Sequence, residues 1–582
     1  MKLKKFISLT ALLMISAPSV AGPWIESDDP LLRASIEMLF NQGIIKQPIN
    51  SYPLMWQGIA RDLDVANTSQ LDEQSLFAYQ HVKHALDNAK QKTSSGIRLN
   101  YNSEPLSQQG FGKRHQQESG VNSYGSITGK RVSAKVSVNY ADDALDKQHV
   151  TYQDSYLAVL LGNWSISAEQ VSHWWGPSND NALLLSNNAA PMKGVRFSRA
   201  NTQYVGPSWL SFIGNWQLTG IYAKQKPYLN NSDDGDFWAL RFASTPLTGF
   251  EIAINSAGSD YLTSLEINPV TLESSESTHR LTSLDVKYST TLAAQPVAFY
   301  AEVMGRNESG LAPSEPFYTL GVESYFGSKE SLLKSYFEYS NTEQSCDQIS
   351  DCVYGSGSYT QSSRLIGSST PLQSKSAILG AYYHTLNGYG GHAKLRWIES
   401  EAAHPEMATD MSQLQLELGY QQQFNFLPGI WSGLGVNANY TYADSEQPDG
   451  NPLLNISKNT ANTQIYWEGE DLQLRLAYNW RDRYLDEQTT KRVQTVGALG
   501  YNVFNQNDPS ADGYDPTVGN SYREARGQFD FSVSYDINES FTVVANAVNL
   551  TGEPIEYTTE LGSVWAYSEA DRRYTLGVRA KF

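Results

Sequence analysis

The chain has 582 residues and a formal net charge of −18, with 35 Tyr and 13 Trp. This acidity excludes nucleic acid as a partner. After the first 21 residues no run of eighteen apolar residues occurs, which excludes a membrane-spanning helix. A membrane protein of this composition would have to cross the bilayer with strands, and the aromatic residues suit girdles at two interfaces.

The first segment, residues 1–21, is typical of an export signal. Three lysines precede the apolar stretch 6–17, and residues 19–21 form a small-x-small cleavage site. We therefore expect the mature chain to start at Gly22, in an oxidising compartment.

Residues 22–92 predict a small bundle of helices. Asp29 and Pro30 supply an N-cap and a first turn, and the apolar face that follows ends at Gly43. Two more helices are expected over residues 53–63 and 73–89. Their short amphipathic stripes indicate a bundle at the periplasmic end of something larger.

From residue 96 onward the period changes from that of a helix to that of a strand. Apolar and polar residues alternate over 132–140, 472–480 and 529–537, among many similar segments separated by turn residues. The pattern predicts a membrane all-β fold, a large antiparallel outer-membrane β-barrel of about 18 to 22 strands.

The chain contains two cysteines, Cys346 and Cys352. In an exported protein such a close pair favours a small loop disulfide. No His or further Cys lies near them in the sequence, so we expect no metal site there.

The last strand predicts how the barrel closes. Tyr574, Leu576, Val578 and Phe582 share one face, and the residues between them share the other. In a membrane barrel the last strand pairs with the first, whereas a soluble protein gains little from an exposed aromatic edge. The alternative is a soluble periplasmic protein whose last strand alternates.

A set of motifs in the first part of the chain resembles the Wzi family. They are His173-Trp-Trp-Gly-Pro-Ser-Asn-Asp180, Gln108-Gln-Gly-Phe-Gly112, Pro296-Val-Ala-Phe-Tyr300 and Glu308-Ser-Gly-Leu-Ala-Pro313. The resemblance covers about residues 22–430. It implies an outer-membrane barrel preceded by a helical bundle, with a role in attaching or organising capsular polysaccharide at the cell surface.

The remaining strands resemble the closing strands of TonB-dependent receptors. The similar segments are residues 433–444, 474–481, 529–536 and 573–577. A TonB-box pentapeptide and a plug of that family's usual size are missing from the sequence.

We therefore divide the chain into four parts. They are a signal peptide (1–21), a periplasmic helical bundle (22–92), a Wzi-like barrel portion (93–430) and receptor-like closing strands of the same barrel (431–582). The added strands favour a total of 22.

The Trp-Trp motif is a candidate saccharide-binding site. Trp174 and Trp175 offer stacking faces, and Asn179, Asp180 and Asn181 offer hydrogen bonds to hydroxyls. The alternative is that the Trp pair anchors a strand end in the interfacial belt, with the following Gly-Pro as its turn.

A second candidate is the most basic patch of this acidic chain. Its residues are Lys113, Arg114, Lys130 and Arg131. They could steer an acidic polysaccharide. The favoured alternative is a solvated loop, or side chains that snorkel to lipid headgroups.

Three functions remain open. The first is a non-enzymatic barrel, without cofactor or metal, that binds and organises or retains capsular polysaccharide. The second is an outer-membrane transporter for an oligosaccharide or another solute. The third is a hydrolase, which the missing catalytic motifs disfavour. The expected partners are outer-membrane lipid, surface polysaccharide and the barrel assembly machinery, and we expect a monomer.

Overall fold

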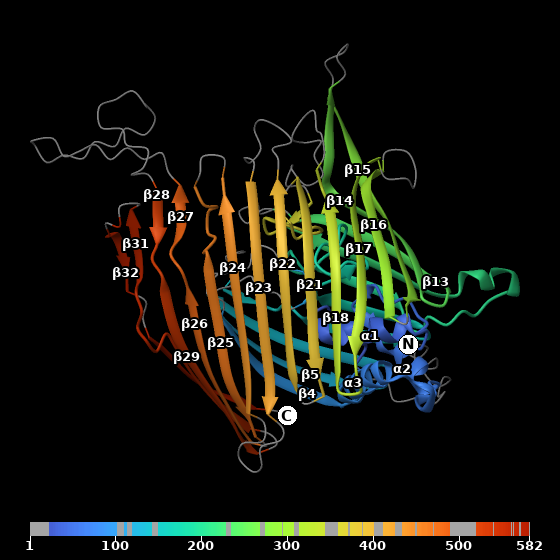
Figure 1. Cartoon of the computed structure of the whole chain (residues 1–582), viewed down its shortest axis with the longest axis horizontal. Coiled ribbons are helices and arrows are strands. Elements are labelled where there is room, and N and C mark those ends of the chain that lie inside the picture. Colours follow the sequence, from blue (N-terminus) through green and yellow to red (C-terminus); the bar gives the residue numbers. More distant parts are fainter. Residues whose placement is uncertain are drawn as a thin grey trace, which may run out of the picture.

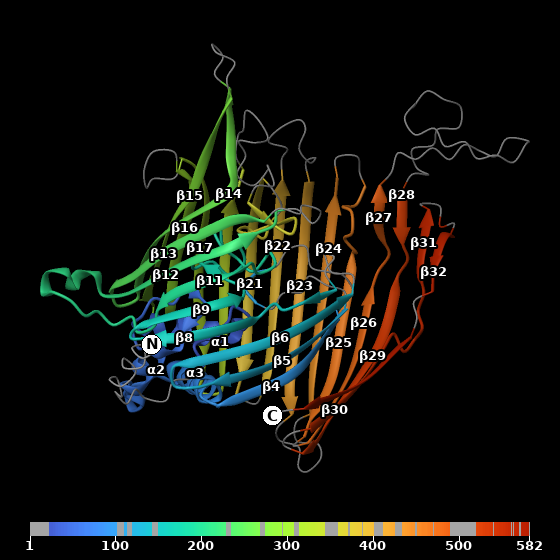
Figure 2. The same ribbon diagram turned by 180° about the vertical axis from the view of Figure 1, so that it is seen from behind.

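The predicted alternation builds one large antiparallel barrel, shown from two sides in Figures 1 and 2. The computed structural model describes residues 22–582 with these exceptions: 102–109, 113–118, 143–148, 228–233, 268–273, 294, 308–313, 344–358, 371–372, 387, 401–410, 425–433, 448–450, 470, 489–519, 539–540, 560–561, 563, 570–571 and 581–582. The expected signal peptide, the two cysteines and Phe582 lie outside the described residues.

The barrel strands follow the chain with few interruptions. In order they are β4 (Thr93–Tyr101), β5 (Ser119–Thr128), β6 (Val132–Asp142), β7 (Val150–Thr151), β8 (Ser155–Leu161), β9 (Trp164–Gln170), β11 (Lys193–Arg199), β12 (Asn215–Gln225), β13 (Gly235–Leu247), β14 (Phe250–Ile267), β15 (Ser274–Leu292), β16 (Gln295–Asn307), β17 (Ser314–Gly327), β18 (Ser331–Asn341), β21 (Ser374–Thr385), β22 (Tyr389–Ser400), β23 (Met411–Phe424), β24 (Leu434–Glu446), β25 (Asn459–Glu468), β26 (Leu472–Arg481), β29 (Arg526–Asn538), β30 (Phe541–Val548) and β33 (Arg573–Ala580).

The strand order is cyclic, with β33 beside β4 and β9 beside β11. It contains 23 described strands. Because β7 and β8 both pair with β6 one after the other, they occupy a single position, which leaves 22. The prediction of an enlarged barrel is therefore confirmed.

The ends of the barrel differ in their connections. Those between β13 and β14, β17 and β18, and β25 and β26 span only two or three residues, whereas those that follow β9 and β18 are long. In outer-membrane barrels the short turns are periplasmic and the long loops are extracellular. The end with the short turns is therefore the periplasmic end, and the end with the long loops is the extracellular end.

The helices form where the sequence predicts them. They are α1 (Pro30–Asn41), α2 (Trp56–Asp64) and α3 (Glu73–Ala89), with 3₁₀ turns η1 (Thr68–Gln70) and η2 (Ser208–Ile213). The Asp29 carboxylate caps α1 by accepting from the amides of Leu31 and Leu32, an interaction of about 1 kcal/mol. None of the described helices combines the length and apolar character needed to cross a bilayer.

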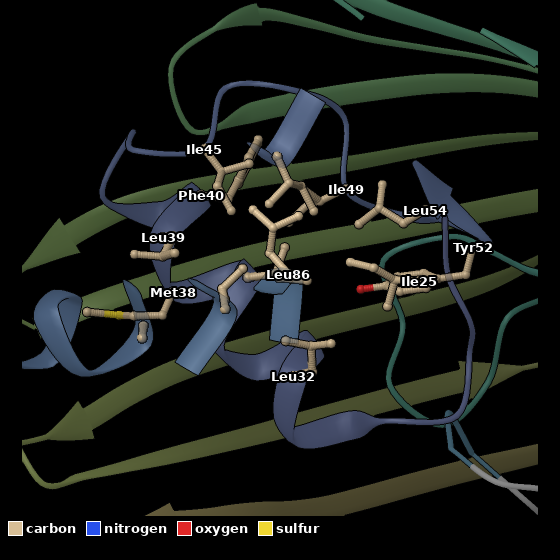
Figure 3. Close-up of a cluster of buried hydrophobic side chains, with 14 of the residues drawn as sticks. Ile25, Leu32, Met38, Leu39, Phe40, Ile45, Ile49, Tyr52, Leu54 and Leu86 are labelled. Carbon is tan, nitrogen blue, oxygen red and sulfur yellow. The ribbon is translucent and has the colours of Figure 1, made fainter. Parts of the chain in front are cut away.

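The helices lie against the inside of the barrel wall (Figures 1 and 2), where α1 packs on β15, β16 and β21 and α3 packs on β17 and β18. Figure 3 shows their shared core, in which Ile36, Leu39 and Phe40 are fully buried. Tyr325 and Leu332 of the wall belong to the same core. The apolar stripe of α1 therefore faces the barrel as well as the other helices.

Short strands fasten this helical unit. β1 (Trp24–Ile25) pairs with β3 (Leu54–Met55), and β2 (Ser51–Tyr52) pairs with β10 (Trp174–Trp175). A third small pair is β19 (Thr360–Gln361) with β20 (Arg364–Leu365).

A second sheet continues four barrel strands beyond a break. It consists of β27 (Tyr484–Gln488), β28 (Asn520–Arg523), β31 (Ile555–Thr559) and β32 (Val564–Ser568). Its order repeats that of β26, β29, β30 and β33, to which each strand is adjacent in sequence. In Figure 1 it stands above these strands at the extracellular end.

The sequence resemblance changes near residue 430, and the described strands on either side of it belong to one continuous wall. Strands β23 and β24 pair along their whole length, from Ser412 with Glu446 to Phe424 with Leu434. The Wzi-like and receptor-like portions are therefore parts of one sheet.

Candidate functional site

Three chain segments meet inside the barrel, and we call them together the luminal plug. They are residues 22–89, the connection 171–192 between β9 and β11, and residues 359–370 from the connection after β18. The connection 171–192 lies between the other two and contains the Trp-Trp motif.

The two indole rings are buried in the plug. Trp174 has an exposed fraction of 0% and Trp175 of 1%. The Nε1 of Trp174 donates to the Ser178 carbonyl at 3.2 Å, and its ring stands edge-on to Phe111 at 5.5 Å between centroids. Pairing with β2 fixes both residues to the helical unit.

The prediction of a stacking platform at Trp174 and Trp175 therefore has to be corrected, because packing covers both ring faces. The alternative placement in the interfacial belt is also wrong, since the pair lies in the plug and not at the lipid surface. A two-residue motif does not show on which side of the wall its loop folds.

Asn179 is a hydrogen-bonding centre between the plug and the wall. Its Oδ1 accepts from Lys334 Nζ at 2.7 Å, and its Nδ2 donates to the Tyr300 hydroxyl at 3.1 Å. Its backbone amide donates to Glu338 at 2.7 Å. Each bond joins the connection 171–192 to a wall strand.

Asp180 forms ion pairs with Arg396 at 2.8 Å and with Lys394 at 3.2 Å, both on β22. The Tyr336 hydroxyl also donates to it. Burial alone would raise the pKa of the Asp180 carboxyl, but the two cations outweigh it and lower the pKa to about 2. The ionised carboxylate therefore joins the connection 171–192 to the wall.

Asn181 joins two segments of the plug. Its Oδ1 accepts from Ser368 Oγ at 2.6 Å and from the Ser369 amide at 3.1 Å. All five residues of the predicted saccharide site therefore lie together, and they hold the plug in place.

The most heavily charged part of this interface was not predicted from the sequence. Glu37 of α1 pairs with Arg33 and with Lys287, both at 3.0 Å, and with Lys334. Glu323 pairs with Lys287 and, at 3.1 Å, with Lys334. Each side chain of this five-residue cluster, which we call the Glu37 cluster, is at most 2% exposed.

Burial would raise the pKa of Glu37, but Lys287, Lys334 and Arg33 hold it well below its ordinary value. Arg33 has a raised pKa for the complementary reason, since Glu37 outweighs the cost of burial. One sequence signal was available: Arg33 and Glu37 are the two charged residues of α1 and lie four residues apart, a spacing that allows an ion pair.

A second buried cluster lies beside Ser51. Arg241 of β13 donates to Asp285 at 3.0 Å and to Ser51 Oγ at 2.6 Å. Glu251 accepts from the Ile49 amide at 2.7 Å. Burying such charged groups costs desolvation free energy, and removing one partner destabilises the fold further because it leaves a buried charge unpaired. The cluster therefore favours one position of the plug.

A hollow lies beside the plug, at the loop ends of β9, β11, β12 and β13. Its apolar wall includes Met192, Ile221 and Phe237. Its polar corner holds Glu169, which contacts His173 Nε2 at 3.2 Å and Arg196 Nε at 2.8 Å. An apolar surface next to charged hydrogen-bonding groups is suited to a sugar ring, which has both kinds of face.

The basic patch is only partly described. Lys130 and Arg131 are exposed in the short turn between β5 and β6. This turn lies at the periplasmic end, as short turns of outer-membrane barrels do. Lys113 and Arg114 lie outside the described residues. The described half of the patch is therefore a solvated turn and does not face the cell surface.

The described part of the last strand agrees with its predicted role. Tyr574, Leu576 and Val578 of β33 are 69% to 77% exposed, as expected of side chains that face lipid. Among the described residues no group of three or more His, Cys, Asp or Glu could hold a metal ion.

The sequence of residues 89–453, more than half of the chain, matches the family described as capsule assembly protein Wzi. The chain belongs to this family. Residues 414–550 also match the family described as TonB dependent receptor-like, beta-barrel. The overlap of the two matches falls on the continuous pairing of β23 and β24.

Known proteins agree with this assignment. A Klebsiella pneumoniae protein described as an uncharacterized 55.8 kDa protein in the cps region is 23% identical over 350 residues, which cover 58% of this chain and 68% of that one. The structure of Escherichia coli Wzi, described as an outer membrane protein involved in group 1 capsule assembly and a carbohydrate binding beta-barrel, superposes with a TM-score of 0.63. It is 18% identical and covers 77% of this chain and 98% of its own.

The siderophore receptor PirA of Acinetobacter baumannii shows a weaker likeness, with a TM-score of 0.48 at 13% identity, over 84% of this chain and 80% of its own. The family and the lipid-facing strands place this Wzi-family chain in the outer membrane.

Proposed function

We propose that this Wzi-family barrel binds capsular polysaccharide at the cell surface and retains it there, without catalysis. The observation that carries the proposal is the family match over residues 89–453, together with the likeness to nearly the whole E. coli Wzi structure. That relative is described as carbohydrate binding. Retention needs a fixed surface rather than a reaction.

The plug supports this role by its construction. Buried ion pairs join helix α1 and the connection 171–192 to the wall, through the Glu37 cluster and through Asp180. A binding surface mounted on such a plug keeps its shape in the absence of the polysaccharide, which lowers the entropic cost of binding.

We assign the polysaccharide contact to the hollow beside His173. It opens at the loop ends of its strands, which is the end that faces the exterior. Met192 and His173, both partly exposed, offer an apolar and a polar contact, and Glu169 with Arg196 lies behind His173. The barrel is proposed to act as a monomer after insertion by the barrel assembly machinery.

The direct test is binding of the purified full-length protein, in detergent, to capsular polysaccharide extracted from the same strain. A Met192→Trp variant fills the hollow and should reduce binding several-fold. Leu240→Trp is the matched control, because Leu240 lies on the lipid-facing side of β13 with 42% exposure.

Equal binding by the wild-type protein and by Met192→Trp would contradict the assignment to the hollow. Binding no stronger than that of an unrelated outer-membrane barrel would contradict the proposed function itself.

A further inference from the structure

The plug is attached to only part of the barrel wall. Its hydrogen bonds and ion pairs to the wall, among the described residues, extend from Lys135 on β6, which binds Glu26, to Arg396 on β22, which binds Asp180. In Figures 1 and 2 the helices lie on the side of β15 to β18, away from β26 and β29. The plug is thus off-centre in a barrel of 22 strand positions.

The inner faces of the two sides differ in exposure. On β18 the inward residues Lys334, Tyr336 and Glu338 are at most 2% exposed, because the plug covers them. On β25 the inward residues between Thr460 and Tyr466 are partly exposed, and Glu468 is exposed. The described part of the plug therefore leaves this face accessible.

The strand register shows which residues form that face. Ile465 of β25 and Leu476 of β26 are 47% and 39% exposed on the lipid side, so the alternate residues point inward. Most of the inward residues carry amides or hydroxyls: Asn437, Asn439, Thr441, Thr460, Asn462, Gln464, Gln473, Asn479, Gln528, Ser532, Ser534 and Asn546. Such groups both donate and accept hydrogen bonds, as water and sugar hydroxyls require.

A small hollow indents this face near the periplasmic turn of β25 and β26. Tyr466, Glu468, Gln473, Arg475, Ser532 and Ser534 line it. An aromatic ring beside amide, hydroxyl and charged groups gives a polar solute a point of contact along the wall.

The charged residues on this face balance one another. Register places Arg475, Arg481 and Arg526 inward, together with Glu468, Asp530 and Asp536. Among the described residues of these strands, neither sign of charge is in excess.

We propose that the inner face of β24, β25, β26, β29 and β30 lines a water-filled passage beside the plug, which admits small sugars. This function goes beyond polysaccharide retention, which we assign to the opposite side of the barrel. The strands that resemble a receptor barrel thereby supply a route for solute as well as closure of the wall.

The test uses full-length protein in liposomes that swell when a sugar enters, with arabinose and sucrose as probes. Wild-type vesicles should swell faster than protein-free ones. Gln464→Trp projects a bulky ring into the passage opposite Asn437 and Ala477, and it should slow swelling several-fold. Ile465→Trp is the control, since it adds the same ring to the lipid side of the same strand.

Swelling no faster than in protein-free vesicles, or equal slowing by Gln464→Trp and Ile465→Trp, would overturn the passage. Should Gln464→Trp fail to assemble, Asn462→Trp at the next inward position replaces it. Loss of the passage would leave polysaccharide binding at the His173 hollow intact, so the two proposals fail separately.

Discussion

At the scale of single residues, the stability of the plugged barrel depends on charged side chains that are buried from water. Glu37 is the clearest example, because its carboxylate pairs with Arg33, Lys287 and Lys334. Removing that charge leaves Arg33 buried without its carboxylate partner and leaves the two lysines to share Glu323.

We therefore expect Glu37→Gln to lower the free energy of unfolding by roughly 3–5 kcal/mol, measured by denaturant titration in detergent. Asp64→Asn is the control, because Asp64 pairs with Lys83 at 3.7 Å in an exposed position, and such pairs contribute at most about 1 kcal/mol. Equal losses in the two variants would show that the Glu37 cluster is not what holds the plug.

Asp180 makes the stability of the plug depend on pH. Its pKa is lowered from 3.8 to about 2, so the ionised form stabilises the folded state by a few kcal/mol at neutral pH. This contribution is fully present above the ordinary pKa and is lost as the pH falls through about 2.

The melting temperature should therefore fall between pH 4 and pH 2. Asp180→Asn should already be destabilised at pH 7 and should lose less on acidification than the wild type. A parallel fall in the melting temperatures of the two proteins on acidification would mean that Asp180 is not the titrating group.

At the scale of elements, the short pair of β2 and β10 joins the helical unit to the connection 171–192. Trp174 and Trp175 lie in that pair with almost no exposed surface. Truncating a buried Trp to Ala typically costs about 3–5 kcal/mol.

We expect Trp174→Ala and Trp175→Ala to reduce the yield of folded barrel, while polysaccharide binding per folded barrel stays at the wild-type level. Heat-modifiable mobility on gels gives the folded fraction for each variant. A selective loss of binding at normal yield would restore the two rings as a saccharide site.

The closing strand β33 allows a test of its two faces. Leu576 is 77% exposed on the lipid side, whereas the register with Asn546 turns Thr575 inward. An Arg on the lipid face costs roughly 2–4 kcal/mol near the bilayer midplane, and an Arg in the lumen costs little.

Leu576→Arg should therefore assemble poorly in the outer membrane, and Thr575→Arg should assemble almost normally. The quantity to measure is folded protein in isolated outer membranes. Equal assembly of the two variants would contradict the orientation of β33.

Individual elements differed in how well the sequence predicted them. The helix over Glu73–Ala89 forms as predicted, because its apolar spacing and its cap, Asp72, are local features. The strands 132–140 and 472–480 were found by their period of two, which is also local. The three-segment plug was not found, because its contacts join residues far apart in the sequence, such as Asp180 and Arg396.

At the scale of the whole molecule, two sequence resemblances share one continuous wall. The Wzi-like strands carry the plug, and the receptor-like strands widen the barrel to 22 positions. We attribute polysaccharide retention to the plugged side and the solute passage to the other side.

The central claim is that this Wzi-family barrel retains polysaccharide at the cell surface. The most direct measurement compares polysaccharide bound to cells with polysaccharide shed into the medium, in the wild type, a deletion strain and the deletion strain carrying the gene. We predict that deletion shifts polysaccharide from the cells to the medium at unchanged total, and that the gene reverses the shift. An unchanged division between cells and medium would contradict the account, as would solute uptake through the barrel that stops when TonB is removed.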